Sequence, residues 1–488
     1  MDRLREEKFD LGITETFNVC GYAIFHNLGI RTHISAFATN LVDVISSALG
    51  VVNNPSYVPA SFTQLTDVMS YSQRLENLIS YSTTFLFFEF VFRRYANFNG
   101  VAPGFDIDVS TFTLKVYHHR RNGDHQKKMF QKAVESSVFA FVNSEEFVEY
   151  SRPINHKIVF VAGIGVKQPQ PLNEAILLAV LPKTMKLHIE EVRAVTRSSH
   201  RYHEYKRIME NAKGAVVLVS FGSVAKSSEM PPKIKDAFVG MFARFPEVIC
   251  AECCCSLMSL FCSSFESSKE REMVTFIWKY EKDDEAAANL TNVIKKKWVP
   301  QNDLFGTCFT VIDVQRIPGA PHPKLSAFVT HGGQNSVIES TNAGIPMICV
   351  PLFGDQMRNA KMAEKRQVAL LLDKRFISSD SLADAIRAVL YNQTYGESAK
   401  RLAQMIRKKP ISARERVIKY TEFAAEFGPF DNLNSAGVRL NFFQYYLIDI
   451  LLPAALILML FIALLAFILI RLMRLLLRFR MESKQKQE

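Results

Sequence analysis

Residues 328–356, F-V-T-H-G-G-Q-N-S-V-I-E-S-T-N-A-G-I-P-M-I-C-V-P-L-F-G-D-Q, decide the fold. The apolar run at 325–330 has the length and composition of a buried strand, and the glycine pair after His331 breaks it. A second apolar run at 345–352 predicts the next strand of the same sheet. A strand, a glycine turn, a helix and another strand in this order indicate a doubly wound parallel sheet.

The helix between these two strands determines what the turn can bind. Asn335 or Ser336 is predicted to supply its N-cap oxygen, and Gly344 with Pro346 is predicted to end it. Free backbone N–H groups and the positive end of the helix dipole would then meet His331 at one place, which suits a diphosphate. Because His-Gly-Gly by itself is usually only a turn, the prediction depends on the length of the whole pattern.

A second glycine turn is expected about a hundred residues earlier. Residues 215–220, A-V-V-L-V-S, predict a buried strand, and Phe221-Gly222-Ser223 follows it. Ser223 could offer its N–H and hydroxyl to the same diphosphate from the opposite side.

Together with Trp298-Val299-Pro300-Gln301, the opening stretch resembles the signature of the UDP-glycosyltransferases, in particular the membrane-bound type that includes the UDP-glucuronosyltransferases. The resemblance implies a GT-B fold, in which two Rossmann-like α/β domains face a cleft, and a UDP-sugar that is a co-substrate rather than a cofactor. It implies no metal. Its implied donor contacts are Trp298 on uracil, Gln301 and Glu339 on ribose, Ser223, His331, Gly333, Asn335 and Ser336 on the diphosphate, and Asp355 and Gln356 on the sugar.

Composition sets limits on the class of protein. The 488 residues, of which 48% are hydrophobic, suffice for two domains. The net charge of +11 is spread along the chain without a recognised nucleic-acid motif, which argues against a nucleic-acid partner. Eight cysteines, three of them consecutive at 253–255, lack the paired spacing of a zinc site.

The N-terminal part follows the same alternation of strand and helix. Strands are predicted at 9–14 and 31–37, with a helix at 19–28 between them. Glu15, just past the first strand, matches the acid that orients the family's catalytic histidine; an ordinary carboxylate at a helix start remains the alternative. His26 and His33 match no catalytic position and are interpreted as structural.

The start of the chain resembles the middle of the family's first domain rather than its beginning. This predicts that an N-terminal portion is missing, and with it the histidine that would act as the base. Three further stretches fit the family pattern poorly and are predicted insertions: 175–203, 249–273 and 307–321. They are either retained intron sequence or surface insertions.

The C-terminal part predicts a membrane anchor. Residues 450–470 are apolar and uncharged, and this stretch is long enough to cross a hydrocarbon core. An arginine-rich tail follows it. That tail places the C-terminus in the cytosol and the domains in the lumen. Lys484 and Lys486 resemble the K-x-K-x-x signal for the endoplasmic reticulum.

The sequence therefore predicts transfer of a hexose or hexuronic acid from a UDP-sugar to a small lipophilic acceptor, with inversion. The alternative is a catalytically inactive or truncated membrane protein that retains at most nucleotide-sugar binding; a homo-oligomer is left open. The predicted parts are a partial acceptor domain at 1–170, a linker at 171–213, a donor domain at 214–430, a transmembrane helix at 446–470 and a basic tail at 471–488.

Overall fold

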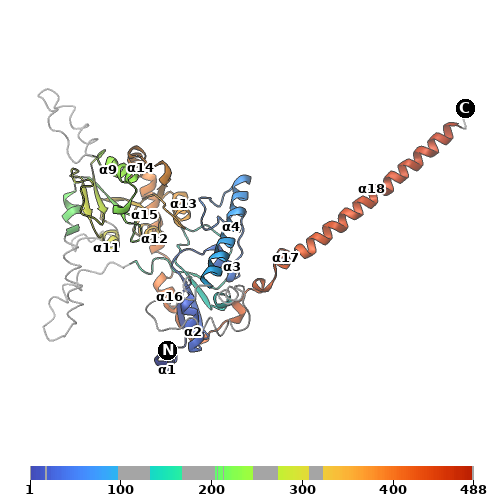
Figure 1. Ribbon diagram of the computed structural model, residues 1–488, viewed down its shortest axis with the longest axis horizontal. Helices are drawn as coiled ribbons and strands as arrows, with labels where there is room; N and C mark the ends of the chain where they lie inside the picture. Colours follow the sequence, from blue (N-terminus) through green and yellow to red (C-terminus); the bar gives the residue numbers. More distant parts are fainter. Residues whose placement is uncertain are drawn as a thin grey trace. The chain divides into compact units, whose positions relative to one another are not determined.

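A computed structural model describes residues 2–16, 19–96, 132–166, 204–205, 207–212, 214–245, 273–306 and 322–485 (Figure 1). The chain divides into two compact units, 1–433 and 434–488. The predicted insertions at 175–203, 249–273 and 307–321 lie outside the described residues apart from Met273, and so does most of the predicted linker.

The first sheet has four parallel strands in the order β1-β2-β3-β4. The strands β1 and β2 are shorter than predicted, and Glu15 is the last residue of β1 rather than the residue after it. The predicted helix at 19–28 is confirmed as α2. The elements of this region are α1 (Asp2–Glu6), β1 (Gly12–Glu15), α2 (Val19–Leu28), β2 (His33–Phe37), α3 (Asp43–Ala48), α4 (Tyr71–Ala96), β3 (Phe139–Val142) and β4 (Ile158–Phe160).

The second sheet has six parallel strands in the order β10-β9-β8-β5-β6-β7. Its central strands are buried on both faces, which is why they read as continuous apolar runs rather than as alternating patterns. The strands are β5 (Ala215–Ser220), β6 (Val274–Lys279), β7 (Val293–Lys296), β8 (Leu325–Thr330), β9 (Met347–Cys349) and β10 (Ala369–Leu371).

Helices cover both faces of the second sheet (Figure 1). On one face, α9 (Pro232–Phe242) and α14 (Ser379–Tyr391) pack Phe238 and Ile386 against the strands. On the other face lie α12 (Gln334–Ala343), α13 (Gln356–Lys365) and α15 (Gln393–Arg407). The second sheet is therefore the middle layer of an α/β/α sandwich, and the predicted fold of two Rossmann-like domains is confirmed.

The chain returns to the first sheet after α15. Helix α16 (Ala413–Phe427) lies against β3, where Tyr420 meets the Phe139 ring edge-on at 4.9 Å between centroids. Ala424 on the same helix is fully buried in a cluster with residues of β2, β3 and β4. The predicted donor range 214–430 thus includes a helix that packs on the first sheet.

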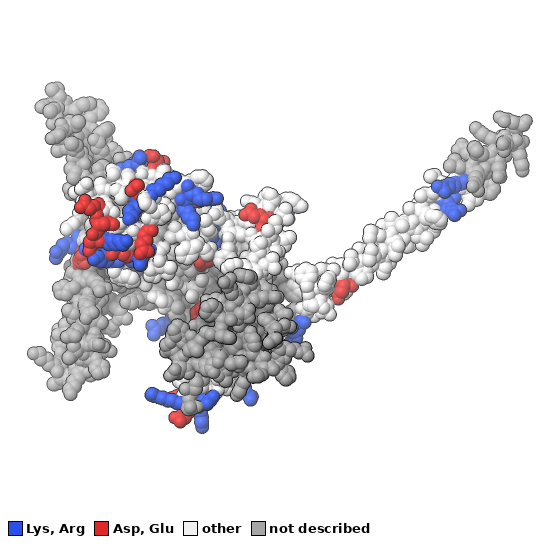
Figure 2. Space-filling view, viewed as in Figure 1, with Lys and Arg blue, Asp and Glu red and all other residues white. Residues whose placement is uncertain are grey.

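The second unit contains α17 (Phe442–Tyr445) and α18 (Ile448–Gln485). Residues Ile448–Leu476 have a mean hydropathy of 3.0, and this is the helix of the described chain that is long and apolar enough to cross a membrane. Its surface is uncharged over most of its length, with basic side chains towards the C-terminal end (Figure 2). The helix continues past the predicted end at 470, since the arginines that follow are good helix formers.

Candidate functional site

The candidate site begins at the turn that follows β8. Gly332 has a φ of +77°, which glycine adopts without strain, and α12 begins at Gln334. The N-cap is Gly333 in an extended conformation, without a side-chain cap bond, so the prediction that Asn335 or Ser336 caps this helix is wrong. The helix starts earlier than its polar residues suggested because the glycine itself makes the turn. Its end is as predicted, with Gly344 in the left-handed conformation.

His331 lies between the two predicted glycine turns. A Cβ on Gly222 would lie 2.9 Å from His331 Cε1, and a Cβ on Gly333 would lie 2.5 Å from His331 Nε2. Both positions therefore need glycine to leave room for the imidazole. The turns meet because β5 and β8 are neighbours whose last residues, Ser220 and Thr330, are paired. The structure thus brings together two segments about a hundred residues apart, as the sequence predicted.

The electrostatics of His331 favour a neutral ring. Burial, and then the charge of Lys279, lowers the pKa of His331 to about 4. At neutral pH the imidazole therefore has one N–H to donate. Thr330 Oγ1 lies 3.4 Å from His331 Nδ1.

Lys279, the last residue of β6, was missed by the sequence analysis. Its ammonium group donates to the carbonyl oxygen of Gly222, and it lies 3.8 Å from a Glu281 carboxylate oxygen. It also lies 5.1 Å from the centroid of the Trp298 ring. A cation next to His331 adds positive potential where a diphosphate would bind. The signal that could have found it is its place at the carboxyl end of a buried strand beside β5.

The residues assigned to the nucleoside lie at the edge of this turn. Trp298 is 59% exposed, so one face of a large ring is available for stacking. Tyr205 holds the backbone of Trp298, since its hydroxyl donates to the Trp298 carbonyl at 2.9 Å. Gln301, the first residue of α11 (Gln301–Gly306), donates through Nε2 to Glu339 Oε2 on α12 at 2.6 Å. Burial raises the pKa of Glu339.

The polar residues at the start of α12 differ in exposure. Asn335 is exposed, while Ser336 is buried. Asn143, which follows β3 in the other domain, donates through Nδ2 to Asn335 Oδ1 at 2.9 Å. Ser223 is exposed beyond Gly222. The sequence analysis missed Asn143, because nothing local marks a contact between residues 192 positions apart.

The two residues assigned to the sugar begin α13. Asp355 is the N-cap of α13, and its Oδ2 accepts a hydrogen bond from Asn359 Nδ2 at 2.8 Å. The Gln356 Oε1 accepts from the backbone N–H of Leu352 at 2.8 Å and of Phe353 at 3.1 Å. The side-chain carbonyl of Gln356 therefore holds the loop that precedes α13.

The candidate acid Glu15 and the two histidines interpreted as structural lie in the first domain. Glu15 pairs with Ala36 at the carboxyl end of β1. His26 is exposed on α2, whereas His33 is buried in β2 and its Nε2 lies 2.7 Å from the Ala133 carbonyl oxygen. Within the described ranges, no group of three His, Cys, Asp or Glu side chains could hold a metal ion.

Segments that follow the carboxyl ends of strands in both sheets contact each other. Asn40 and Asn143, which follow β2 and β3, reach Asn359 and Asn335 of the second domain. Because β1 is parallel to β2, Glu15 lies on that same edge of the first sheet. The fold therefore presents the candidate acid towards the domain that carries the candidate donor site.

Comparison with known proteins gives the family. The family model "UDP-glucoronosyl and UDP-glucosyl transferase" matches residues 1–184 and 267–487. Among solved structures, the glycotransferase of kitacinnamycin aligns with 15% identity and a TM-score of 0.47, over 87% of this chain and 79% of that one. A UDP-glucosyltransferase from Polygonum tinctorium aligns with 15% identity and a TM-score of 0.46, over 88% and 79%.

Curated relatives agree with the family model. UDP-glucosyltransferase 2 of Dactylopius coccus is 25% identical over 92% of this chain and 69% of its own length. Putative UDP-glucuronosyltransferase ugt-48 of Caenorhabditis elegans is 24% identical over 93% and 70%. Human UDP-glucuronosyltransferase 1A6 is 26% identical over 92% and 66%. The chain spans about two thirds of the length of these relatives, and it belongs to the family of UDP-glucuronosyl and UDP-glucosyl transferases.

Proposed function

We propose that this chain binds a UDP-sugar with its diphosphate against the N-terminus of α12. The observation that carries the proposal is the position of His331, a neutral imidazole enclosed by Gly222 and Gly333. The first N–H groups of a helix have no partner within the helix, so they can bind phosphate oxygens beside that imidazole. Lys279 adds a positive charge to the same place.

The remaining groups give the donor its direction. Uracil would stack on the exposed face of Trp298, and the ribose would meet the Gln301–Glu339 pair. The sugar would lie at the start of α13, against Asp355 and the amide nitrogen of Gln356. This order would put the reacting carbon of the sugar towards the edge of the first sheet that carries Glu15.

The reaction that we propose is inverting transfer to a hydroxyl, amine or thiol of a small lipophilic acceptor. A base takes the proton of the acceptor while the acceptor atom forms a bond to the sugar carbon. The bond from that carbon to the phosphate oxygen breaks, and UDP leaves with the electron pair. Attack from the face opposite UDP inverts the anomeric carbon. His331 and the N–H groups of α12 stabilise the departing charge, and Glu15 orients the base.

The test measures UDP binding on the whole chain in detergent, and transfer on the same chain extended at its N-terminus by a segment that carries the histidine base of the family. Calorimetry with UDP, UDP-glucose and UDP-glucuronate is expected to show binding, and NMR of a glycosylated phenol is expected to show a β-linked product from the α-linked donor. No UDP binding would contradict the donor site. Binding without product would reject transfer and establish the non-catalytic alternative, and an α-linked product would reject inversion.

We further propose that α18 anchors the chain in the endoplasmic reticulum membrane with both domains in the lumen. The support is the apolar stretch Ile448–Leu476 followed by arginines on one side.

Glycosylation tests this orientation. Asn289 in the sequon Asn289-Leu290-Thr291 is exposed, whereas the side chain of Asn392 in Asn392-Gln393-Thr394 caps α15. Expressed behind a cleavable signal peptide, the chain is expected to carry glycan at Asn289, seen as a mass shift that a glycosidase removes and Asn289→Gln abolishes. A folded, membrane-bound product with Asn289 unmodified would contradict the lumenal placement.

A further inference from the structure

Asn359 connects the candidate sugar site to the acceptor domain. It lies one turn into α13 and its side chain is fully buried. Its Nδ2 donates to Asp355 Oδ2 at 2.8 Å, and its Oδ1 accepts from Asn40 Nδ2 at 3.2 Å. One amide therefore bridges a carboxylate of the second domain and a side chain 319 positions earlier in the chain.

The direction of these two hydrogen bonds is fixed by chemistry. An ionised carboxylate can only accept, so the amide nitrogen of Asn359 must face Asp355. The amide oxygen of Asn359 then faces Asn40, which must present its own nitrogen. A flip of either amide would place two acceptors or two donors against each other. Asn40 thus supports the orientation in which Asn359 donates to the Asp355 carboxylate.

Asn40 itself has little other reason to be buried. It follows β2 in the acceptor domain and is fully buried, and its Oδ1 has no hydrogen-bond partner among the described residues. Leaving a buried acceptor unsatisfied is unfavourable, so a purely structural role would be better served by an apolar side chain. Its contact with Asn359 explains why an amide is present.

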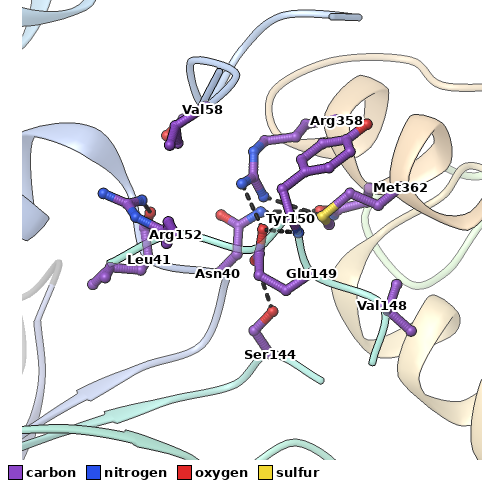
Figure 3. Close-up of polar contacts among 12 residues, drawn as sticks. Asn40, Leu41, Val58, Ser144, Val148, Glu149, Tyr150, Arg152, Arg358 and Met362 are labelled. Atoms are coloured by element: carbon purple, nitrogen blue, oxygen red, sulfur yellow. Dashed lines mark hydrogen bonds and ion pairs between the residues drawn. The ribbon is translucent and has the colours of Figure 1, made fainter. Parts of the chain in front are cut away.

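The neighbouring residue of α13 keeps the two domains in register for this contact. Arg358 is buried and pairs with Glu149 of the acceptor domain at 2.5 Å (Figure 3). Asn40 lies beside this pair in the same view. Arg366, just after α13, donates to the Glu149 carbonyl at 2.8 Å. Arg358 near the start of α13 and Arg366 just after its end therefore both hold this helix against the segment that follows β3.

We propose that Asn359 is a positioning residue, which fixes the Asp355 carboxylate for the hydroxyls of the donor sugar, and that Asn40 makes this depend on the acceptor domain. The proposal rests on the proposed function, because it assumes that Asp355 meets the sugar. Unlike the residues of the proposed function, Asn359 and Asn40 are assigned no contact with the donor. Their substitution should therefore affect recognition of the sugar and spare recognition of UDP.

The experiment compares UDP with UDP-glucose by calorimetry on the full chain in detergent. Asn359→Ala is expected to weaken UDP-glucose binding about tenfold and to change UDP binding less than about twofold, since a hydrogen bond to a charged group is lost only at the sugar end. Asn40→Ala, which leaves the Asn359–Asp355 bond in place, is expected to weaken UDP-glucose binding about threefold in the same selective way.

The matched control is Asn292→Ala. Asn292 is also a buried asparagine of the second domain, and its Nδ2 donates to the carbonyl oxygens of Phe242 and Phe245. It precedes β7, so it lies at the amino end of the strands, away from the candidate sugar site. This variant should lower the thermal midpoint without separating UDP-glucose from UDP. Equal weakening of both ligands by Asn359→Ala and Asn40→Ala, or weakening of neither, would overturn the inference. No UDP binding by the unmodified chain would instead reject the proposed function.

Discussion

Replacing His331 by alanine is expected to weaken UDP binding by roughly ten- to a hundredfold, because a hydrogen bond to a charged phosphate contributes about 1.5–3 kcal/mol. The neutral ring has one N–H to donate. Isothermal calorimetry with UDP measures the loss directly. His331→Gln keeps an N–H donor and should restore part of the affinity.

Gly333→Ala gives an independent test of the same geometry. The added Cβ would lie 2.5 Å from His331 Nε2, so the ring must move although its chemistry is intact. We expect a loss of UDP affinity in the same direction as for His331→Ala. His26→Ala, on an exposed position of α2, is the control and should bind UDP as the unmodified chain does. Unchanged UDP affinity in both site variants would show that the diphosphate does not bind at this turn.

Replacing Glu149 by alanine is expected to lower the free energy of unfolding by about 3–5 kcal/mol, because it leaves the buried Arg358 guanidinium without its partner. The same change also removes the acceptor of the Ser144 hydroxyl, which donates to Glu149 Oε2 at 2.9 Å. The thermal midpoint of the chain in detergent should fall by several degrees. The double variant Glu149→Leu with Arg358→Met should recover most of the loss, since apolar residues of similar volume can replace a buried pair. A single variant as stable as the unmodified chain would show that the pair does not hold the domains together.

The Glu149–Arg358 pair is expected to stabilise the folded chain at neutral pH and to lose this effect in acidic solution. Burial raises the pKa of Glu149, but the charge and hydrogen bonds of Arg358 outweigh it and the pKa is lowered overall. The unfolded chain therefore binds the proton more tightly than the folded chain, and the stabilisation is complete above the unfolded pKa of about 4.3. It is lost as the pH falls through the folded value. The difference between the unmodified chain and Glu149→Gln should be constant from pH 6 to 8 and should shrink only in more acidic solution.

Local patterns were sufficient to predict β5, β8 and β9 of the second sheet and the turn at His331. The strand at 325–330 and the glycine turns around His331 depend on apolar runs and on glycine conformations, which are properties of neighbouring residues. The N-cap of α12 was predicted wrongly because polar side chains near the turn competed with Gly333, and only the backbone conformation decides between them. Lys279 was missed because its role comes from the order of strands in the sheet.

The contacts between the domains could not be predicted from spacing. Asn40 meets Asn359, and Asn143 meets Asn335, across hundreds of residues. Each asparagine follows a strand and resembles an ordinary turn residue in the sequence. Only the parallel arrangement of both sheets, with their carboxyl ends turned towards each other, gives these residues a partner.

Helix α16 has a consequence for the order in which the protein can fold during synthesis. Domains generally fold from the N-terminus as the ribosome releases them. Here, however, one face of the first sheet, with Phe139 and Val159, is covered by a helix that the ribosome makes after the whole second domain. Until Ala424 has emerged, that apolar face lacks the cover that α16 gives it. The first domain to be translated is therefore the last to be completed, and a chaperone that recognises exposed apolar strands has the whole translation time of the second domain in which to bind it.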